Sequence, residues 1–165
     1  MRRLLLLVGL FGIALGLGAG AVAAKTDFSG TWVMDTSRSE GVPPEMEQTM
    51  TVKQAGDTLD VETKVVTDQG DQTLAATYVL DGKEAPYTTK RMNAEGKGKR
   101  TAKWTADGAG LEITEEETFD SPNGEVTLHF SRKWAMLADG KTLTIELEVN
   151  GPNGPQHSKR TFVKR

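Results

Sequence analysis

Apolar residues recur at every second position in one segment after another from Met46 onward. Side chains of a β-strand alternate between its two faces, so this period predicts strands with one buried and one solvated face. The positions between them carry Thr, Lys, Glu and Asp, as a solvated face requires. Two of the clearest runs are Leu74, Ala76, Tyr78, Leu80 and Leu143, Ile145, Leu147, Val149.

Short turn signals separate these segments, among them Asp81-Gly82, Asp139-Gly140 and Asn150-Gly151. Asp-Gly and Asn-Gly accept the positive φ angles of tight hairpins, so strands that follow one another are expected to pair antiparallel. Pro86 interrupts the fifth predicted strand, because proline has no N–H to donate to a ladder. Strands are predicted near residues 30–35, 46–54, 58–66, 72–80, 84–90, 99–105, 111–119, 125–134, 142–149 and 157–164.

A sheet of this many strands with one apolar face either closes on itself or splits into two packed layers. Closure removes exposed strand edges, and an uninterrupted order of hairpins favours an up-and-down barrel over a Greek-key sandwich. We therefore predict an all-β fold, an antiparallel up-and-down β-barrel of about 8 to 10 strands. The irregular stretch 36–44 is either a surface loop or a flap over one mouth of the barrel.

The first 24 residues resemble a signal peptide that precedes this domain. Met1-Arg2-Arg3 is followed by an uncharged run, Leu4–Ala24, that ends in small residues suited to cleavage. The alternative is a leader retained as a membrane anchor. We expect a cleaved leader (1–24), a single barrel domain (25–165), no stable membrane span after cleavage, and a periplasmic or secreted location. The chain has no cysteine, so neither a lipid anchor on cysteine nor a disulfide is available.

Charge argues against nucleic acid as a partner. Residues 25–165 keep 18 of the 20 basic residues and all 23 acidic ones, which gives a net charge of −5 with histidine neutral. A phosphate backbone is bound by clustered Lys and Arg. The one basic cluster, Lys97-Gly98-Lys99-Arg100, is short and is expected to be a solvated loop and strand entry.

The same alternation places charged residues inside the predicted barrel. It puts Arg132, Arg100 and Arg160 on inward positions, together with Glu115 and Glu117. A buried arginine needs a counter-charge, and three arginines against two glutamates leave one positive charge for an anionic ligand. The alternative is that Arg132 only pairs with Glu115 or Glu117. The predicted ligand-binding residues are Arg132, Arg160, Tyr78, Trp104, Trp134 and Phe130, of which the aromatic residues fit core packing equally well.

Enzymatic functions find little support in the chain. His129 and His157 have neither metal-ligand spacing nor a nucleophile as partner, and Gly-x-Ser-x-Gly is absent. We predict no catalytic residues, no metal and no cofactor. A small hydrolase or isomerase that uses the barrel interior is a third hypothesis.

The stretch Gly30-Thr31-Trp32 resembles the start of the first strand in the calycin group, which comprises lipocalins and fatty-acid-binding-protein-like barrels. In lipocalins an arginine of the last strand packs across this tryptophan, which implies that role for Arg160 and structural roles for Gly30 and Trp32. The ending Arg160-Thr161-Phe162 is similar to the Arg-x-Tyr of fatty-acid-binding proteins, with Phe162 in place of tyrosine. Residues 36–44 are too few for the two helices of that family.

This resemblance, to exported bacterial lipocalin-like proteins, implies a non-enzymatic barrel that binds a small hydrophobic or amphipathic molecule in the cell envelope, with an anionic ligand as one option. The competing hypothesis is a structural or interaction module whose barrel is filled by its own side chains, with a protein partner that the sequence does not identify.

Overall fold

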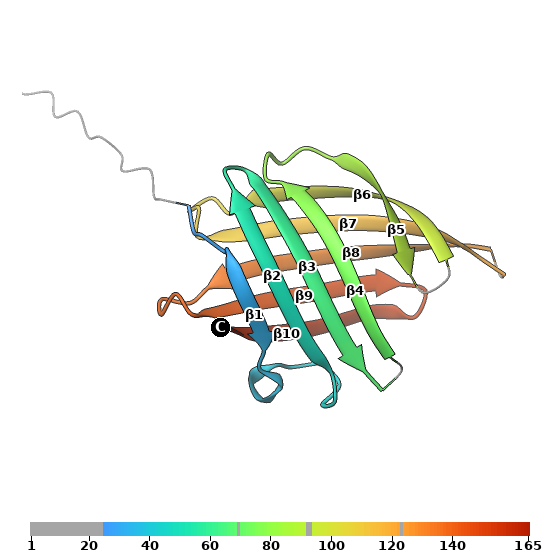
Figure 1. The fold of residues 1–165 in the computed structure, drawn as a ribbon. Helices are drawn as coiled ribbons and strands as arrows, with labels where there is room; N and C mark the ends of the chain where they lie inside the picture. Colours follow the sequence, from blue (N-terminus) through green and yellow to red (C-terminus); the bar gives the residue numbers. More distant parts are fainter. Residues whose placement is uncertain (1–24, 69, 92–93, 123) are drawn as a thin grey trace, which may run out of the picture.

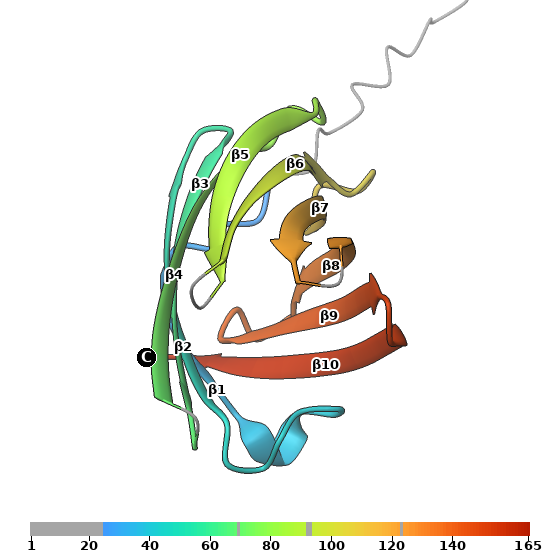
Figure 2. The ribbon, with the colours of Figure 1, turned by 90° about the vertical axis from the view of Figure 1, so that its right-hand side faces the viewer.

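The computed structural model describes residues 25–68, 70–91, 94–122 and 124–165, so the predicted signal peptide lies outside the described residues. Ten antiparallel strands form one strongly curled sheet (Figures 1 and 2), which confirms the predicted all-β, up-and-down fold. The strands are β1 (Gly30–Met34), β2 (Glu47–Ala55), β3 (Thr58–Thr67), β4 (Gly70–Val79), β5 (Ala85–Arg91), β6 (Ala94–Trp104), β7 (Gly110–Ser121), β8 (Gly124–Met136), β9 (Thr142–Gly151) and β10 (Gly154–Lys164).

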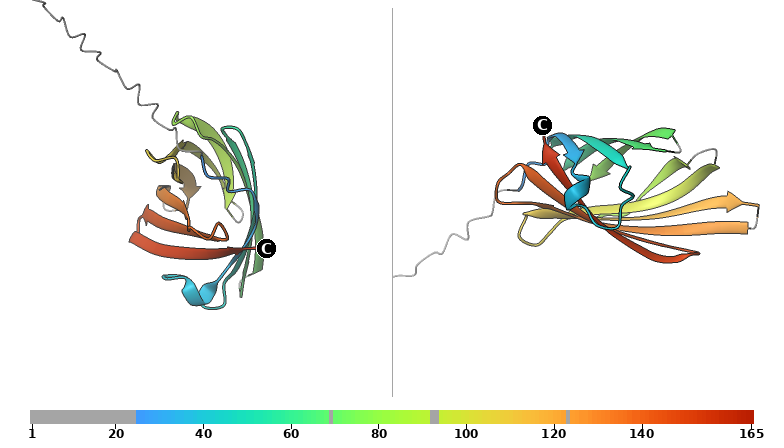
Figure 3. Two further views of the ribbon diagram at one scale, coloured as in Figure 1. Left: turned by 90° about the vertical axis from the view of Figure 1, so that its left-hand side faces the viewer. Right: turned by 90° about the horizontal axis from the view of Figure 1, so that it is seen from below.

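The order of strands in the sheet is β4-β3-β2-β1-β10-β9-β8-β7-β6-β5, so the first and last strands pair in its middle. The sheet curls into two facing walls, β1–β4 and β6–β10 (Figure 3). Within the described residues no ladder joins β4 to β5, which are the two ends of the sheet. The result is a half-barrel that is open along one side, whereas we predicted closure.

The connection between β4 and β5 explains this difference. Gly82 has the predicted positive φ, 73°. However, the Leu80 N–H donates to Asp57 O at 2.7 Å and the Gly82 N–H donates to Ala102 O at 2.9 Å. These bonds tie the turn to β6 and to the β2–β3 turn, so it does not close a hairpin. The resulting edge position of β5 accommodates Pro86, which could not donate to a ladder.

Aromatic residues fill one end of the half-barrel, which we call the closed end. Trp32, Phe28 and Phe162 are each 0% exposed. The Trp32 indole N–H donates to Phe28 O at 2.9 Å. Phe28 stacks on Trp104 at 6.2 Å between ring centroids and meets Trp134 edge-on at 5.8 Å. The segment 26–29 that carries Phe28 therefore acts as a plug at this end.

The connection between β1 and β2 is held against β10. It contains a short 3-10 helix, η1 (Thr36–Arg38). The Asp35 N–H donates to Thr161 O at 2.8 Å, and Glu40 and Lys159 exchange backbone hydrogen bonds at 2.8 and 2.9 Å.

No helix in the described ranges has the length and apolar character that crossing a membrane requires.

Strand β6 begins five residues before its predicted start and includes Lys97-Gly98, which we expected to be a loop. Its inward positions there are Gly96 and Gly98. A Cβ on Gly96 would lie 2.5 Å from the Phe119 ring, and one on Gly98 would lie 2.6 Å from the Tyr87 ring. The glycines make room for these rings, and so they remove the apolar alternation that marks a strand in the sequence.

Candidate functional site

The strand register confirms that the predicted charged residues share the inward face. Arg132 lies opposite Ile113 on β7 and Leu147 on β9. Glu115 lies opposite Phe130 on β8 and Arg100 on β6. Residues directly opposite one another on neighbouring strands point to the same side of the sheet. The polar residues therefore lie among apolar side chains inside the curl.

Glu115 is the centre of a buried cluster, which we call the Glu115 cluster and which comprises Glu115, Arg132, Arg100 and Tyr78. Glu115 is 7% exposed. The Nη1 of Arg132 contacts Glu115 Oε2, and Arg100 Nε lies 3.6 Å from Glu115 Oε1. The Tyr78 hydroxyl donates to the same Oε1 at 3.3 Å. The structure thus contains the ion pair between Arg132 and Glu115 that was one of the two sequence-based alternatives.

Burial and these charges determine how the cluster titrates. Burial raises the pKa of Tyr78 to about 12, with Arg132 opposing the rise and Glu115 adding to it. Burial also raises the pKa of Tyr87, and the charges of Glu115 and Glu117 reinforce this. Burial alone would lower the pKa of Arg132, but Tyr78 and Glu115 outweigh it and the pKa is raised. At neutral pH both tyrosines are therefore hydrogen-bond donors and Arg132 is charged.

Arg160 and Gln48 form a second polar group, the Arg160 pair, from β10 and β2. The Nη1 of Arg160 donates to Gln48 Oε1 at 2.9 Å, and Gln48 is only 6% exposed. The buried Arg160 Nε has no hydrogen-bond partner, and no carboxylate of the described chain lies within ion-pair distance of Arg160. Burial and the nearby charge of Arg132 lower the pKa of Arg160.

The expected packing of Arg160 across Trp32 is wrong. Trp32 lies opposite Lys164 in the register, and Lys164 Nζ is 5.2 Å from the centroid of the Trp32 ring. Arg160 lies opposite Ile145 instead, four residues before Lys164 along β10. Lys164 therefore provides the cation that covers the tryptophan, and Arg160 points into the half-barrel.

A cleft of about 270 Å³ lies between β4 and β5. Its outer walls come from the unpaired edges of these strands and include Leu74 and Thr88. Its inner lining is polar and reaches the Glu115 cluster. A further groove of about 580 Å³ runs along the same gap beside Pro86 and Val79. The residues that line the inner part of the cleft are Tyr78, Tyr87, Arg100, Glu115, Glu117 and Arg132.

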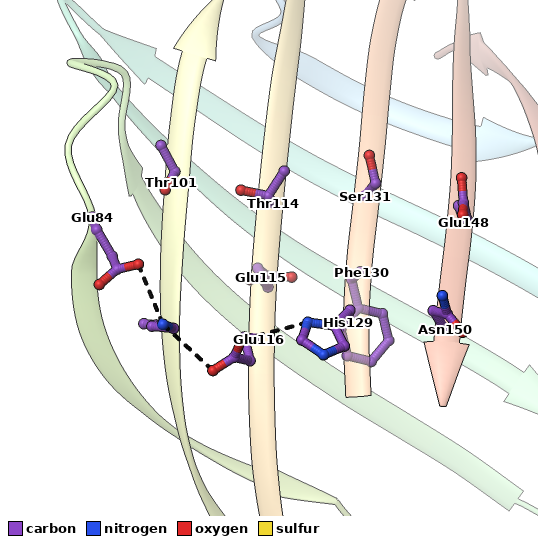
Figure 4. Close-up of a pocket in the computed structure, with 11 residues that line it drawn as sticks. Glu84, Thr101, Thr114, Glu115, Glu116, His129, Phe130, Ser131, Glu148 and Asn150 are labelled. Atoms are coloured by element: carbon purple, nitrogen blue, oxygen red, sulfur yellow. Dashed lines mark ion pairs between the residues drawn. The ribbon is translucent and has the colours of Figure 1, made fainter. Parts of the chain in front are cut away.

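A groove of about 370 Å³ on the outer face of β6–β9 offers less (Figure 4). Lys99 lies 3.6 Å from Glu84 and 3.5 Å from Glu116, and His129 Nδ1 lies 3.5 Å from Glu116. These charges are paired with one another along the surface. Within the described ranges no group of three His, Cys, Asp or Glu residues could hold a metal ion.

The predicted aromatic ligand contacts fall into two groups. Trp134 (4% exposed) and Trp104 pack on Phe28 at the closed end. Phe130 and Tyr78 lie beside the polar residues, with Arg132 Cζ 5.4 Å from the Phe130 ring centroid. The structure brings Tyr78 and Arg132 together around Glu115, and ligand contact by any of the six residues stays a prediction.

Two residues of the interior were not predicted as part of a site. Gln48 is in phase with the inward Met50 and Val52, so the alternation did contain the signal. Tyr87 lies in the strand interrupted by Pro86, where the pattern was weakest. Its hydroxyl donates to Glu117 Oε1 at 2.9 Å.

No protein-family model matches the chain, and no curated protein matches it. Solved structures do. A secretory abundant heat soluble protein from Ramazzottius varieornatus matches with a TM-score of 0.50 and 17% identity, over 86% of this chain and 97% of that protein. The zebrafish ileal bile acid-binding protein, crystallised with cholic acid, matches with a TM-score of 0.50 and 16% identity, over 84% and 98%. By fold, this chain is a calycin-like antiparallel half-barrel.

Proposed function

We propose that the protein binds a small amphipathic acid inside the half-barrel and catalyses no reaction. The Arg160 pair holds the acidic head of the ligand. Its apolar part lies along inward side chains that are only partly buried, among them Val65, Leu147 and Val149. Sites for small ligands combine such an apolar lining with a few polar groups that fix orientation.

The observation that carries this proposal is the unpaired guanidinium of Arg160. A partly buried cation without a counter-charge is costly, and Gln48 offers Arg160 only a neutral oxygen at 2.9 Å. Arg132, in contrast, is paired with Glu115. An acid bound at Arg160 would supply the missing charge and accept from the free Nε.

The zebrafish protein of the same fold was crystallised with cholic acid, a carboxylic acid with a large apolar body. This supports an acid of the same general character for the present chain. The leader-like residues 1–24 support export, so we place the ligand in the periplasm or outside the cell.

A second candidate is a structural or interaction module without a ligand. The Glu115 cluster favours it, because Glu115 already neutralises one arginine and contacts a second. Aromatic residues also fill the closed end. The two candidates differ in what happens at Arg160, which the module hypothesis leaves without a counter-charge.

Arg160→Met and Arg132→Met separate the two functions. If Arg160 holds the acid, Arg160→Met weakens binding of oleate and cholate about 10- to 100-fold, the range expected for a lost charge-assisted hydrogen bond. Arg132→Met mainly lowers the free energy of unfolding, because it deprives Glu115 of its closest cation. Lys133→Met is the matched control, since Lys133 is exposed on the opposite face of β8.

Binding is measured by calorimetry and stability by urea unfolding. Native mass spectrometry of the purified protein, before and after organic extraction, tests for a co-purified acid. Equal affinity of wild type and Arg160→Met for both acids contradicts the assignment of Arg160. Absence of any bound or added acid favours the module without a ligand.

A further inference from the structure

Side chains rather than backbone hydrogen bonds bridge the open side between β4 and β5, and we call this region of contact the seam. Every other pair of neighbouring strands in the described sheet shares a ladder. The ladder between β3 and β4, for example, contains ten residue pairs. Figure 2 shows β4 and β5 as the two free edges of the curled sheet. The seam is therefore where the wall depends on the fewest interactions.

One side chain, that of Arg100 on β6, reaches both edges of the seam. Its Nη1 donates to the backbone oxygen of Thr77 on β4 at 3.3 Å. Its Cζ lies 3.5 Å from the ring centroid of Tyr87 on β5 and 5.0 Å from that of Tyr78 on β4. The Arg100 side chain is 13% exposed. It therefore stacks between the two free edges and covers the cleft from inside.

These contacts are weak compared with a ladder. The bond to Thr77 is long, the separation of Arg100 from Glu115 is 3.6 Å, and the buried Arg100 Nε has no hydrogen-bond partner. Segments with few backbone hydrogen bonds open locally at a small fraction of the global unfolding free energy. β4 and β5 can thus separate without breaking any pairing between strands.

The cleft behind Arg100 leads toward the proposed ligand site. Its lining runs from Leu74 and Thr88 on the two edges to Arg132 on the inward face of β8. Arg132 is close enough to Arg160 for its charge to lower the pKa of Arg160. The closed end, in contrast, is filled by the plug, whose Phe28 is 0% exposed and packs on Trp104 and Trp134.

We propose that the seam is the passage by which the acid enters and leaves the half-barrel, and that Arg100 is the clasp that sets the rate of exchange. This inference rests on the proposed function, since it assigns a route to the same site. Arg100 itself holds no ligand. Its stacking on Tyr87 and its bond to Thr77 break when the seam opens and form again when it closes.

A cross-link across the seam tests the passage. The chain has no native cysteine, so Thr77→Cys on β4 and Thr88→Cys on β5 can be joined by a short bifunctional maleimide, since both residues are exposed and line the groove along the gap. The matched control joins Thr49→Cys to Lys64→Cys, which face each other on the paired strands β2 and β3. The probe is the fluorescent acid 1-anilinonaphthalene-8-sulfonate, followed by stopped flow.

Locking the seam is expected to slow both association and dissociation of the probe about tenfold or more, while the control cross-link leaves both rates unchanged. Unchanged exchange after cross-linking of the seam would overturn the passage and assign entry to an end of the half-barrel. Because a cross-linked variant can misfold, a second variant tests the clasp without cross-linking.

Arg100→Met removes the charge and the bond to Thr77 but keeps a long apolar side chain. The association and dissociation rate constants of the probe are both expected to rise about fivefold to tenfold, because the hydrogen bond to Thr77 no longer has to break before the seam opens. The dissociation constant, which is their ratio, is expected to change less. The neighbouring Lys99→Met is the control, since Lys99 is on the outer face and pairs with Glu84 and Glu116. Equal rates in wild type and Arg100→Met contradict the clasp.

Hydrogen exchange without any probe separates failure of the clasp from failure of the proposed function. Amides of β4 are expected to exchange faster in Arg100→Met than in wild type, and those of β2 are not. If the amides respond but wild type binds no acid, the clasp stands as a structural contact and the ligand function and passage fall. If acid binds but neither amides nor rates respond, the function stands and the inference from the seam is wrong.

Discussion

The closed end and the seam are built from different interactions although one sheet forms both. At the closed end Trp32 and Phe162 are fully buried on strands that pair in the middle of the sheet. At the seam, Tyr87 and Arg100 join two strand edges that share no ladder. Apolar burial with paired backbones gives the larger free energy per residue. The closed end therefore carries more of the stability, and the seam is the part of the wall held by the weaker contacts.

The largest expected effect separates these two regions directly. Trp32→Ala removes a fully buried ring and the donor to Phe28 O, and we expect it to lower the free energy of unfolding by about 3–5 kcal/mol. Tyr87→Ala, at the half-buried seam, is expected to lower it by about 1–2 kcal/mol. Urea unfolding of both variants measures the difference. Equal losses would mean that the seam is as important for folding as the closed end.

The second prediction concerns the polar interior between the two regions. Glu115→Gln leaves Arg132 and Arg100 without their shared carboxylate, and is expected to cost about 2–4 kcal/mol of unfolding free energy. Adding Arg132→Met should cost less than the sum of the two single changes, with a coupling of about 1–3 kcal/mol. The outward neighbour serves as control, since Glu116→Gln removes only exposed pairs worth less than about 1 kcal/mol. Additive single and double variants would show that Glu115 and Arg132 act independently.

The smallest effect, a pH dependence, reports on the two tyrosines that join the seam to the Glu115 cluster. The chain has two tyrosines, Tyr78 and Tyr87, and both line the cleft. The pKa of Tyr78 is raised from 10.0 to about 12, so its contribution to stability is complete below pH 10 and is lost as the pH rises to about 12. Ultraviolet absorbance should show little tyrosinate in the native protein at pH 10, and Tyr78→Phe should reduce the loss of stability above that pH. Half-ionised tyrosine at pH 10 in a folded sample would contradict burial at the seam.

Much of this architecture could be predicted from the sequence, because strand period and turn dipeptides are local signals. The alternation of Leu143, Ile145 and Leu147 marks β9, and Asp139-Gly140 marks the hairpin before it. The inward phase of Arg132 and Glu115 followed from the same rule, and their ion pair was one of two stated alternatives.

The parts that failed depend on contacts between distant segments. Nothing near Asp81-Gly82 indicates that its backbone bonds go to Ala102 and to the β2–β3 turn, so the open side was not predicted. The early start of β6 was hidden because Gly96 yields its inward space to Phe119. The prediction that Arg160 packs across Trp32 was wrong because it came from a family resemblance. The strand register instead places Lys164 opposite Trp32, with its Nζ over the ring.

The position of the open side has a consequence for redesigning the chain. β1 and β10 are hydrogen-bonded neighbours, whereas the turn 80–84 joins two strands that are not. A circularly permuted protein that links residue 165 to residue 25 and begins within this turn would keep every pairing between strands. The new N- and C-termini of the chain would then lie on β5 and β4, the two edge strands of the sheet. A sensor or affinity group fused to either terminus would be next to the cleft.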